Sequence, residues 1–342
     1  MPDTSRSGTA DVLVVGAGPA GSCAATVAAR AGLQVVLADA ARFPRHRPGE
    51  TIGQETVESL EQLIGTKLFA VDSLRFQAIQ RSGSLGHQVS LASGLHIRRE
   101  VLDAVLVDTA RAAGADVRLS RPCARPIRSG AGWNISVGRE DMAATFLIDA
   151  SGSARWLQRA LDIADLALSI NLIARYWYGP RRNEENSPHF ELDERGWTWM
   201  SPVSGDSEVT CEMVWPGTSE PVRGRGALMR DVSWRVAGEL AGHDFALAGD
   251  SAGQIDPSSA NGIQRAVLSG IGAGNLAVHR CRGGAPDEPT LNYCRSVTTK
   301  ILRDCATLHQ AYETHSGRVD PVGFALLAEQ FLKGNHGSSA CG

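Results

Sequence analysis

Residues 11–39 read DVLVVGAGPAGSCAATVAARAGLQVVLAD, and this stretch decides the fold. An apolar run at 11–16 ends in glycine, a run of small residues follows at 22–31, and a second apolar run occupies 33–38. Short apolar runs bounded by glycine indicate buried strands, and the small-residue segment between them indicates a helix. The stretch therefore predicts a β-α-β unit, whose two strands are parallel because a helical crossover joins them.

Three glycines shape the first turn of this unit, in the spacing GxGxxG. Gly16 permits the tight turn, Gly18 lets the backbone approach a pyrophosphate, and Gly21 allows close packing of the helix. Asp39 ends the second strand and can accept hydrogen bonds from ribose hydroxyls. A bare glycine motif is common, but the strand before it, the helix after it and the acid beyond it predict a bound dinucleotide.

A second stretch, 246–262, reads ALAGDSAGQIDPSSANG. It begins as a short buried strand, places Gly249 and Asp250 at the end of that strand, and then opens a helix near Ile263. The residues expected to open the helix are Pro257, Asn261 and Gly262. Free N–H groups and the dipole at a helix start favour negative charge nearby, such as that of a reduced flavin ring.

Composition narrows the function classes. The chain has 342 residues, 43% of them apolar and 21% charged, with a formal net charge of -3. These values are typical of a globular protein of two connected domains, and the scattered basic residues favour no nucleic-acid partner. We expect no metal site, because the seven cysteines and nine histidines form no ligand-like pairs. Without a long apolar run or a signal-like start, we expect no membrane partner and a cytoplasmic location.

Taken together, these motifs resemble the FAD-dependent oxidoreductases that have the fold of the aromatic hydroxylases, over roughly residues 11–270. The resemblance implies that Asp250 binds ribityl or ribose hydroxyls, that the turn at Pro257 approaches the isoalloxazine ring, and that Arg99 reaches the phosphate or ribose region. Arg45 lies in a segment similar to the one beyond the ADP fingerprint, and 149–152 is similar to the central strand-end motif. The implied cofactor-binding residues are Gly16, Gly18, Gly21, Asp39, Arg45, Gly49, Arg99, Gly249, Asp250, Asn261 and Gly262.

The resemblance also implies the architecture. We expect an α/β protein with a Rossmann-like FAD-binding domain, an inserted antiparallel β-sheet on the substrate side and a short C-terminal helical region. The alternating pattern at 169–214 is typical of the antiparallel sheet. The predicted division assigns 1–168 and 246–280 to the FAD-binding domain, 169–245 to the sheet domain, 281–332 to C-terminal helices and 333–342 to a disordered tail.

Two segments are similar to a narrower branch, which contains the flavin-dependent halogenases and the flavoproteins that mature tryptophan-derived quinone cofactors. Residues 48–52, PGETI, are similar to a Gly-Glu-Ser segment beside the flavin, and 196–202, GWTWMSP, to a Trp-x-Trp-x-x-Pro segment. The candidate catalytic residues are Glu50, Trp197, Trp199 and Pro257. Glu50 is interpreted as a base toward an indole or phenol proton, or as a residue that only binds backbone.

The two tryptophans are equally compatible with a packed aromatic strand, because they share one face of it. His87 and His96 are weaker acid–base candidates and are expected to be exposed on a pair of strands. Arg81 is a further candidate, for a substrate carboxylate.

The sequence departs from the halogenase pattern where the resemblance implies a lysine that carries the oxidant. That position is Ile79, and the nearest lysine, Lys67, lies before the expected site. The tryptophan motif also ends in Ser201-Pro202 rather than Ile-Pro, and the chain ends at Gly342, before the large helical region expected of a halogenase. A shorter chain would leave a more open site, which favours a large substrate.

These observations predict an FAD-dependent monooxygenase that hydroxylates or oxidises an aromatic, tryptophan-like or indole-like group, in cofactor maturation or natural-product biosynthesis. The group is carried by a small molecule, a peptide or a carrier. A flavin-dependent halogenase and a non-catalytic flavin-binding partner remain as alternatives, and dehydrogenation stays open. Because no second GxGxxG is present, NAD(P)H reduces the FAD by docking directly, or a separate flavin reductase supplies the electrons.

Overall fold

The computed structural model describes residues 8–316, except 85, 131, 183, 205, 219–226 and 286. At one end of the molecule lies a seven-stranded sheet in the order β6-β2-β1-β9-β8-β7, with β17 paired to β9. Strands β6, β2, β1, β9 and β17 are parallel, and β8 and β7 continue the sheet as antiparallel strands. Its strands are β1 (Gly8–Val15), β2 (Val35–Asp39), β6 (Asp116–Leu119), β7 (Ile127–Ser129), β8 (Gly132–Val137), β9 (Glu140–Asp149) and β17 (Phe245–Leu247).

The predicted β-α-β unit forms the centre of this sheet. Helix α1 (Pro19–Arg30) joins β1 to β2, and the two strands are parallel neighbours, as the sequence predicts. Small residues along α1 let α5 (Gly262–Cys281) pack closely against it. A side chain at Gly270 would place its Cβ 2.2 Å from the carbonyl oxygen of Ala20, so this crossing requires glycine. Helix α3 (Arg99–Ala112) contacts α1 on another side.

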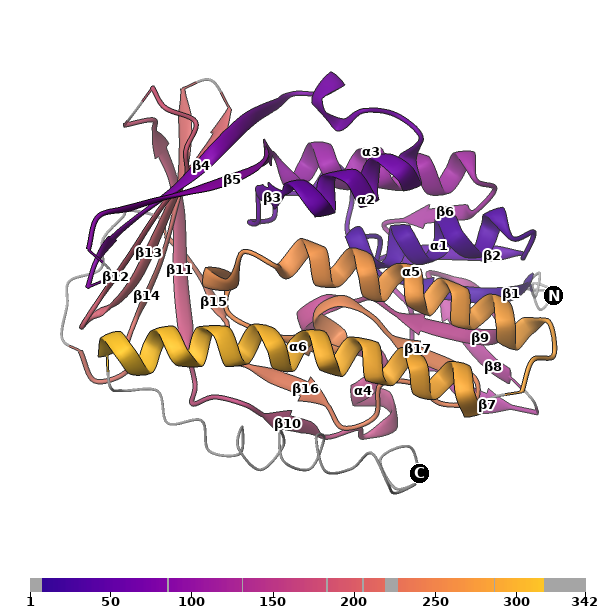
Figure 1. Cartoon of the computed structure of the whole chain (residues 1–342). Helices are drawn as coiled ribbons and strands as arrows, with labels where there is room; N and C mark the ends of the chain where they lie inside the picture. Colours follow the sequence, from indigo (N-terminus) through magenta and orange to yellow (C-terminus); the bar gives the residue numbers. More distant parts are fainter. Residues whose placement is uncertain are drawn as a thin grey trace.

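A second sheet of eight strands occupies the other end of the molecule (Figure 1), in the order β15-β11-β14-β13-β12-β4-β5-β3. All its neighbours are antiparallel except β12 and β4. Its strands are β3 (Thr51–Gly53), β4 (Ser73–Gly83), β5 (Gln88–Ile97), β11 (Ile173–Pro180), β12 (His189–Asp193), β13 (Gly196–Ser204), β14 (Ser207–Val214) and β15 (Leu228–Asp231).

Smaller elements connect the two sheets. A three-stranded sheet contains β10 (Asp165–Ala167), β16 (Arg235–Ala237) and β18 (Gly253–Gln254). The remaining helices are α2 (Gln54–Ile64), α4 (Trp156–Leu161) and α6 (Asp287–Ser316), with single 3₁₀ turns η1 (Leu68–Ala70), η2 (Gly152–Ala154), η3 (Gly249–Ser251) and η4 (Pro257–Ser259). Figure 1 shows α6 running beside α5, with its C-terminal end near the eight-stranded sheet.

The sheets cross the predicted domain division in more than one place. Strand β16 lies in the predicted sheet domain, but it pairs with β10 and β18, which the prediction assigns to the FAD-binding domain. Strands β3, β4 and β5 come from residues 51–97, which the sequence division placed in the FAD-binding domain, yet they belong to the eight-stranded sheet. The order of segments along the chain does not reveal this, because β4 pairs with β12 across more than a hundred residues. The predicted tail at 333–342 lies outside the described residues.

Two kinds of feature are absent from the described residues. No helix among them combines the length and the apolar character that a bilayer crossing requires. Within the same part of the chain, no group of three or more His, Cys, Asp and Glu side chains is arranged to hold a metal ion.

Candidate functional site

A cavity of about 580 Å³ lies where the two large sheets and the start of α5 meet. This volume is within the range of about 300–1,000 Å³ that is common for ligand sites. The glycine turn after β1 lines one end, and the residues around Pro257 line the other, together with strands of the eight-stranded sheet. Carboxyl ends of β1, β2 and β9 face this cavity, which is where open α/β sheets bind their ligands.

The glycines of the turn have different tasks. Gly16 has a φ of +105°, and a Cβ there would lie 2.3 Å from the carbonyl oxygen of Ala150. A Cβ at Gly21 would lie 1.8 Å from the carbonyl oxygen of Gly16, so the helix can pack on the turn only without a side chain. Gly18 lines the cavity, and its Cβ would meet only the end of the Arg45 side chain, at 3.2 Å. Gly18 therefore leaves room for the ligand, while the other two make the turn possible.

Asp39 holds the turn in place. Its carboxylate accepts hydrogen bonds from the backbone N–H of Ala17 at 2.7 Å and of Ala41 at 2.8 Å, and from Nη1 of Arg45 at 2.9 Å. A carboxylate has about four acceptor positions, so one remains for a ribose hydroxyl. The structure thus adds a backbone-fixing task to the ribose contact that the sequence predicts.

Two arginines of the candidate set share a buried carboxylate beside the cavity. Arg99 donates from Nε and Nη2 to Asp103 at 3.0 and 3.2 Å, and from Nη1 to the carbonyl oxygen of Pro48 at 3.1 Å. Arg45 Nε lies 3.5 Å from the same carboxylate. Burial lowers the pKa of Arg99 most strongly, but Asp103 outweighs burial and the pKa is raised. Asp103 therefore holds both guanidinium groups beside the cavity.

The second end of the cavity contains the residues of the 246–262 stretch. Gly249 has a φ of +66° and donates its N–H to the hydroxyl of Ser269 at 2.9 Å. Asp250 follows it, lines the cavity and makes no hydrogen bond to another described residue, so its carboxylate is available to ligand hydroxyls. Nothing lies within 4 Å of a Cβ built on Gly262, at the start of α5. The cavity thus offers arginines for the phosphates of FAD, the free carboxylate of Asp250 for its hydroxyls, and open space at the starts of α1 and α5.

Asn261 is placed differently from the other predicted cofactor residues. It does not line the cavity, and its side-chain amide donates to Asp304 of α6 at 3.1 Å. The same carboxylate binds Arg265 at 2.9 Å and Lys300 at 2.7 Å. Asn261 therefore ties the start of α5 to α6, and a direct contact of its side chain with the cofactor remains a proposal.

Asp256, which the sequence reasoning missed, fixes the turn at Pro257. Its fully buried carboxylate accepts from Trp234 Nε1 at 2.8 Å, from the hydroxyl of Tyr312 at 2.9 Å, and from the backbone N–H of Ser258 at 2.9 Å. Burial raises the pKa of Asp256, and these donors oppose the rise. The signal was present in the sequence, because Asp before Pro-Ser is a common way to start a helical turn.

Glu50 lies buried on the cavity wall, and its carboxylate is held at both oxygens. Oε2 accepts from the backbone N–H of Gly49 at 2.7 Å, and Oε1 accepts from the hydroxyl of Tyr178 on β11. Burial raises the pKa of Glu50, although the Tyr178 hydrogen bond and the nearby Arg99 pull it down. Tyr178 was not among the predicted residues, because the sequence separates it from Glu50 by 128 positions.

His96 is fully buried, so the expectation of an exposed strand residue is wrong. Its Nε2 lies 2.8 Å from the carbonyl oxygen of Asn186, which can only accept, so Nε2 carries the proton. Nδ1 is then an acceptor for the hydroxyls of Ser201 at 2.9 Å and Thr51 at 3.0 Å. Burial lowers the pKa of His96 to about 4. A neutral imidazole thus orients Thr51, which lines the cavity. His87 is exposed, as predicted.

The two tryptophans of β13 occupy different environments. Trp199 lines the cavity together with Tyr176 and Cys211, whereas Trp197 is 2% exposed and belongs to the hydrophobic core. Phe190 lies between them, with ring centroids 6.4 Å from Trp197 and 6.2 Å from Trp199. The geometry supports a site role for Trp199 and a packing role for Trp197.

No described lysine lines the cavity. Ile79 lies on β4 outside the lining, and Lys67 binds Glu61 at 2.7 Å on the exposed surface. Lys300 binds Asp304 and lines a different cavity. Arg81 donates to Ser90 at 2.6 Å and also lies outside the lining.

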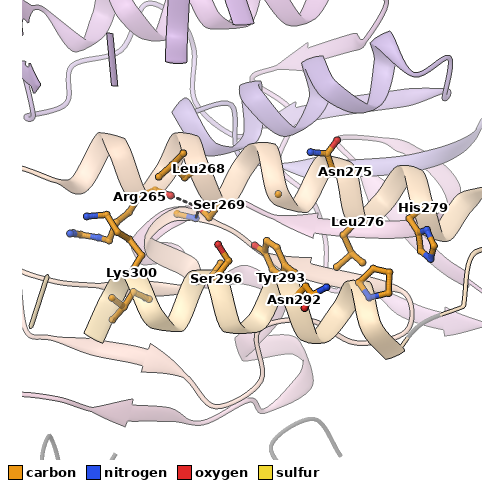
Figure 2. Close-up of a pocket in the computed structure, with 16 residues that line it drawn as sticks. Arg265, Leu268, Ser269, Asn275, Leu276, His279, Asn292, Tyr293, Ser296 and Lys300 are labelled. Carbon is orange, nitrogen blue, oxygen red and sulfur yellow. Dashed lines mark hydrogen bonds between the residues drawn. The ribbon is translucent and has the colours of Figure 1, made fainter. Parts of the chain in front are cut away.

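A second cavity, of about 390 Å³, lies between α5 and α6. Figure 2 shows Arg265 and Lys300 at one end of it, His279 at the other, and Leu268, Leu276 and Tyr293 between them. Gly249 and Arg265 line both this cavity and the cavity of about 580 Å³ described above, so the two cavities lie on different sides of α5.

Comparisons with known proteins indicate a flavoprotein. A profile of the family described as FAD dependent oxidoreductase matches residues 11–160. The chain is 27% identical to the flavin-dependent halogenase armH3 of Armillaria mellea, with 81% of this chain and 69% of that protein covered. It is 28% identical to a menaquinone reductase of Mycolicibacterium smegmatis, covering 81% of this chain and 78% of that protein.

Solved structures share the fold. A flavin-dependent brominase matches with a TM-score of 0.76 at 18% identity, over 85% of this chain and 84% of that one. A flavoprotein/dehydrogenase from Cytophaga hutchinsonii matches with a TM-score of 0.77 at 20% identity, over 94% and 92%. At such identities the likeness establishes the architecture alone.

Proposed function

This chain is an FAD-dependent oxidoreductase of the aromatic-hydroxylase fold, in the branch that contains the flavin-dependent halogenases, and on that premise we propose that it transfers oxygen to an aromatic, indole-like group. Bound FAD supplies the redox chemistry, in which reduced flavin and dioxygen generate the oxidant. Because the family is described as an oxidoreductase and the relatives are named as enzymes, the alternative of a non-catalytic flavin-binding partner is set aside.

The observation that carries the proposal is the composition of the cavity wall on the side of the eight-stranded sheet. Trp199 and Tyr176 offer aromatic surface there, Glu50 offers a buried carboxylate, and no described lysine is present. Aromatic walls with one placed polar group suit a flat aromatic substrate. A lysine that could hold an oxidised halide is the part that the halogenase resemblance requires and that the described wall does not provide.

In this proposal Glu50 moves a proton. Its ionised carboxylate accepts the acidic proton of an indole N–H or a phenol, which increases the electron density of the ring toward the oxidant. Tyr178 holds Oε1 by its hydrogen bond, so the orientation of the carboxylate is fixed before substrate binds. Thr51, oriented by His96, is the neighbouring polar contact for the substrate.

We propose that two groups of residues bind the two ends of FAD. The adenosine and phosphate end is bound by Gly16, Gly18, Gly21, Asp39, Arg45 and Arg99. The ring end is bound by Gly49, Gly249, Asp250, Pro257 and Gly262. The source of electrons is proposed to be NAD(P)H, directly or through a separate flavin reductase. Oxidation of NADPH by the purified holoenzyme without a reductase would establish the direct route, and its failure until a reductase is added would establish the other.

A peptide-bound or carrier-bound substrate is part of the proposal. Strand β15 is at the edge of its sheet, all four of its residues are exposed, and Arg230 and Asp231 line the cavity. An edge strand next to a catalytic cavity can pair with an extended peptide. Binding of a fluorescently labelled tryptophan-containing peptide, compared with free tryptophan, tests this; turnover of the free amino acid alone would exclude it.

Halogenation is the second candidate, because the chain is similar to several proteins named as halogenases. The test of both is mass spectrometry of the products formed from indole, tryptophan and a tryptophan peptide by the reduced enzyme with oxygen and bromide. A gain of oxygen supports the proposal, and a gain of bromine overturns it in favour of halogenation. Loss of two hydrogens would instead indicate dehydrogenation.

A further inference from the structure

The charges around the cavity fall into two groups. Arg45 and Arg99 each have a carboxylate partner, in Asp39 and Asp103. Arg47 and Arg230 line the same cavity, and neither forms an ion pair with a described carboxylate. Arg45 and Arg99 are assigned above to the phosphates of FAD, whereas Arg47 and Arg230 have no role in the proposal so far.

Arg47 and Arg230 come from distant parts of the chain that meet at the cavity. Arg47 precedes the segment that carries Glu50, whereas Arg230 lies on β15 of the eight-stranded sheet. Burial lowers the pKa of Arg47 most strongly, the charges of Arg45, Arg230 and Arg99 lower it further, and the charge of Asp39 opposes them. The two guanidinium groups therefore repel each other, and an anion between them would remove the repulsion.

Three of the four described carboxylates that line the cavity are engaged with other partners, and the fourth, Asp250, forms no ion pair with Arg47 or Arg230. The carboxylate of Asp231 accepts from the N–H and hydroxyl of Ser233, at 2.9 and 2.6 Å. Glu50 binds Tyr178 and Gly49, and Asp39 binds Arg45. No described carboxylate thus lies within ion-pair distance of Arg47 or Arg230.

Aromatic surface lies beside this pair of cations. The guanidinium carbon of Arg230 lies 5.9 Å from the centre of the Tyr176 ring, and Tyr176 is 2% exposed and lines the cavity. Trp199 lines the same wall. A ligand that placed a ring against Tyr176 would have an anionic substituent near Arg230, and Arg47 lines the same cavity.

We propose that Arg47 and Arg230 form an oxyanion subsite that selects an aromatic molecule carrying a carboxylate or a phosphate. The inference rests on the proposed function, because it specifies which aromatic molecules enter that cavity. Two sources of this chemistry exist, namely a carboxylate on the aromatic substrate and a phosphate on the nicotinamide nucleotide that reduces the flavin. The planar fork of arginine suits either group.

The test measures binding to the oxidised holoenzyme by the change in flavin absorbance, so it needs no turnover. The probes are indole-3-acetate, its uncharged counterpart 3-methylindole, and NADPH. We expect Arg230→Gln to weaken indole-3-acetate at least ~10-fold while 3-methylindole changes less than ~2-fold. Arg230→Lys should give an intermediate loss, because it keeps the charge and loses the fork. Rising salt should weaken only the charged probe.

Arg175→Gln is the matched control, since Arg175 neighbours Tyr176 on β11 but lies outside the cavity lining. The FAD affinity of Arg47→Gln and Arg230→Gln is measured in parallel, which separates loss of cofactor from loss of ligand. A loss confined to NADPH assigns the subsite to the reductant and still supports it. The proposal is overturned if wild type binds no charged probe more tightly than 3-methylindole, or if Arg230→Gln matches wild type with both charged probes. Either result leaves the product assay for oxygen transfer unaffected.

Discussion

Tyr178 on β11 donates its phenolic hydrogen to Glu50, which lies on the segment leading into β3. The bond joins the segment that follows the cofactor-binding turn to a strand of the other sheet. Glu50 lines the cavity, and burial raises its pKa although the bond to Tyr178 lowers it.

Replacing Glu50 by Gln should lower kcat by about 100-fold, because general acid–base groups contribute about that much. The base must be ionised, so wild-type kcat should rise with pH through a pKa above the usual value of a glutamate, and the variant should lose this rise. Stopped-flow turnover across pH, with FAD affinity measured alongside, checks both. Glu58→Gln, on the exposed face of α2, is the control. Unchanged kcat in Glu50→Gln would contradict the role.

The buried His96 should make the free energy of unfolding fall in acid. Its folded pKa of about 4 lies below the usual value of 6.5, so its stabilising contribution is complete above about 6.5 and is lost as pH falls toward 4. Near pH 5 the unfolded chain binds almost one more proton at this site, giving a slope of about 1 kcal/mol per pH unit. Urea titrations at several pH values should show His96→Gln without this slope. The same slope in His96→Gln and in the exposed control His87→Gln would disprove the assignment.

The two glycines of the turn should respond differently to alanine. Gly21→Ala forces its Cβ to 1.8 Å from a backbone oxygen, so we expect a loss of about 3 kcal/mol or more in the free energy of unfolding. Gly18→Ala meets only a flexible arginine end, so the fold should persist while FAD binds more weakly. Chemical denaturation and FAD titration measure the two effects. Equal destabilisation by both variants would show that the turn is arranged differently.

Asp256→Ala should destabilise the protein by about 3 kcal/mol, because it leaves the indole N–H of Trp234 buried without its acceptor and removes the carboxylate that also accepts from Tyr312 and Ser258. Tyr312→Phe removes one donor and should cost about 1 kcal/mol. Urea unfolding measures both values. If the alanine variant cost no more than the phenylalanine variant, the carboxylate would not be the centre of this cluster.

The sequence predicts most of the residues at the dinucleotide end of the cavity and few of the contacts at its substrate end. At the dinucleotide end the glycines and Asp39 lie within one β-α-β unit, so spacing alone determines their geometry. The Glu50–Tyr178 pair joins residues 128 positions apart, and no local pattern encodes such a contact.

His96 illustrates another limit. Residues 88–93 of β5 are mostly exposed and residues 94–97 are all buried, since the strand passes from the edge of the sheet into the interior. Alternation along a strand tells which residues share a face, but not where a neighbouring element covers that face. Asp256 was within reach of sequence reasoning, because it precedes proline and serine as a turn-starting residue does.

The parallel pairing of β4 with β12 determines when this protein can fold during its synthesis. β4 ends at Gly83, but β12 spans His189–Asp193, so β4 lacks that partner until the ribosome has made the intervening residues. The first sheet waits longer, because β17 joins β9 only after residue 245. Neither sheet is complete in an N-terminal half of the chain, so until the later strands are made each sheet has an open edge that can pair with another chain.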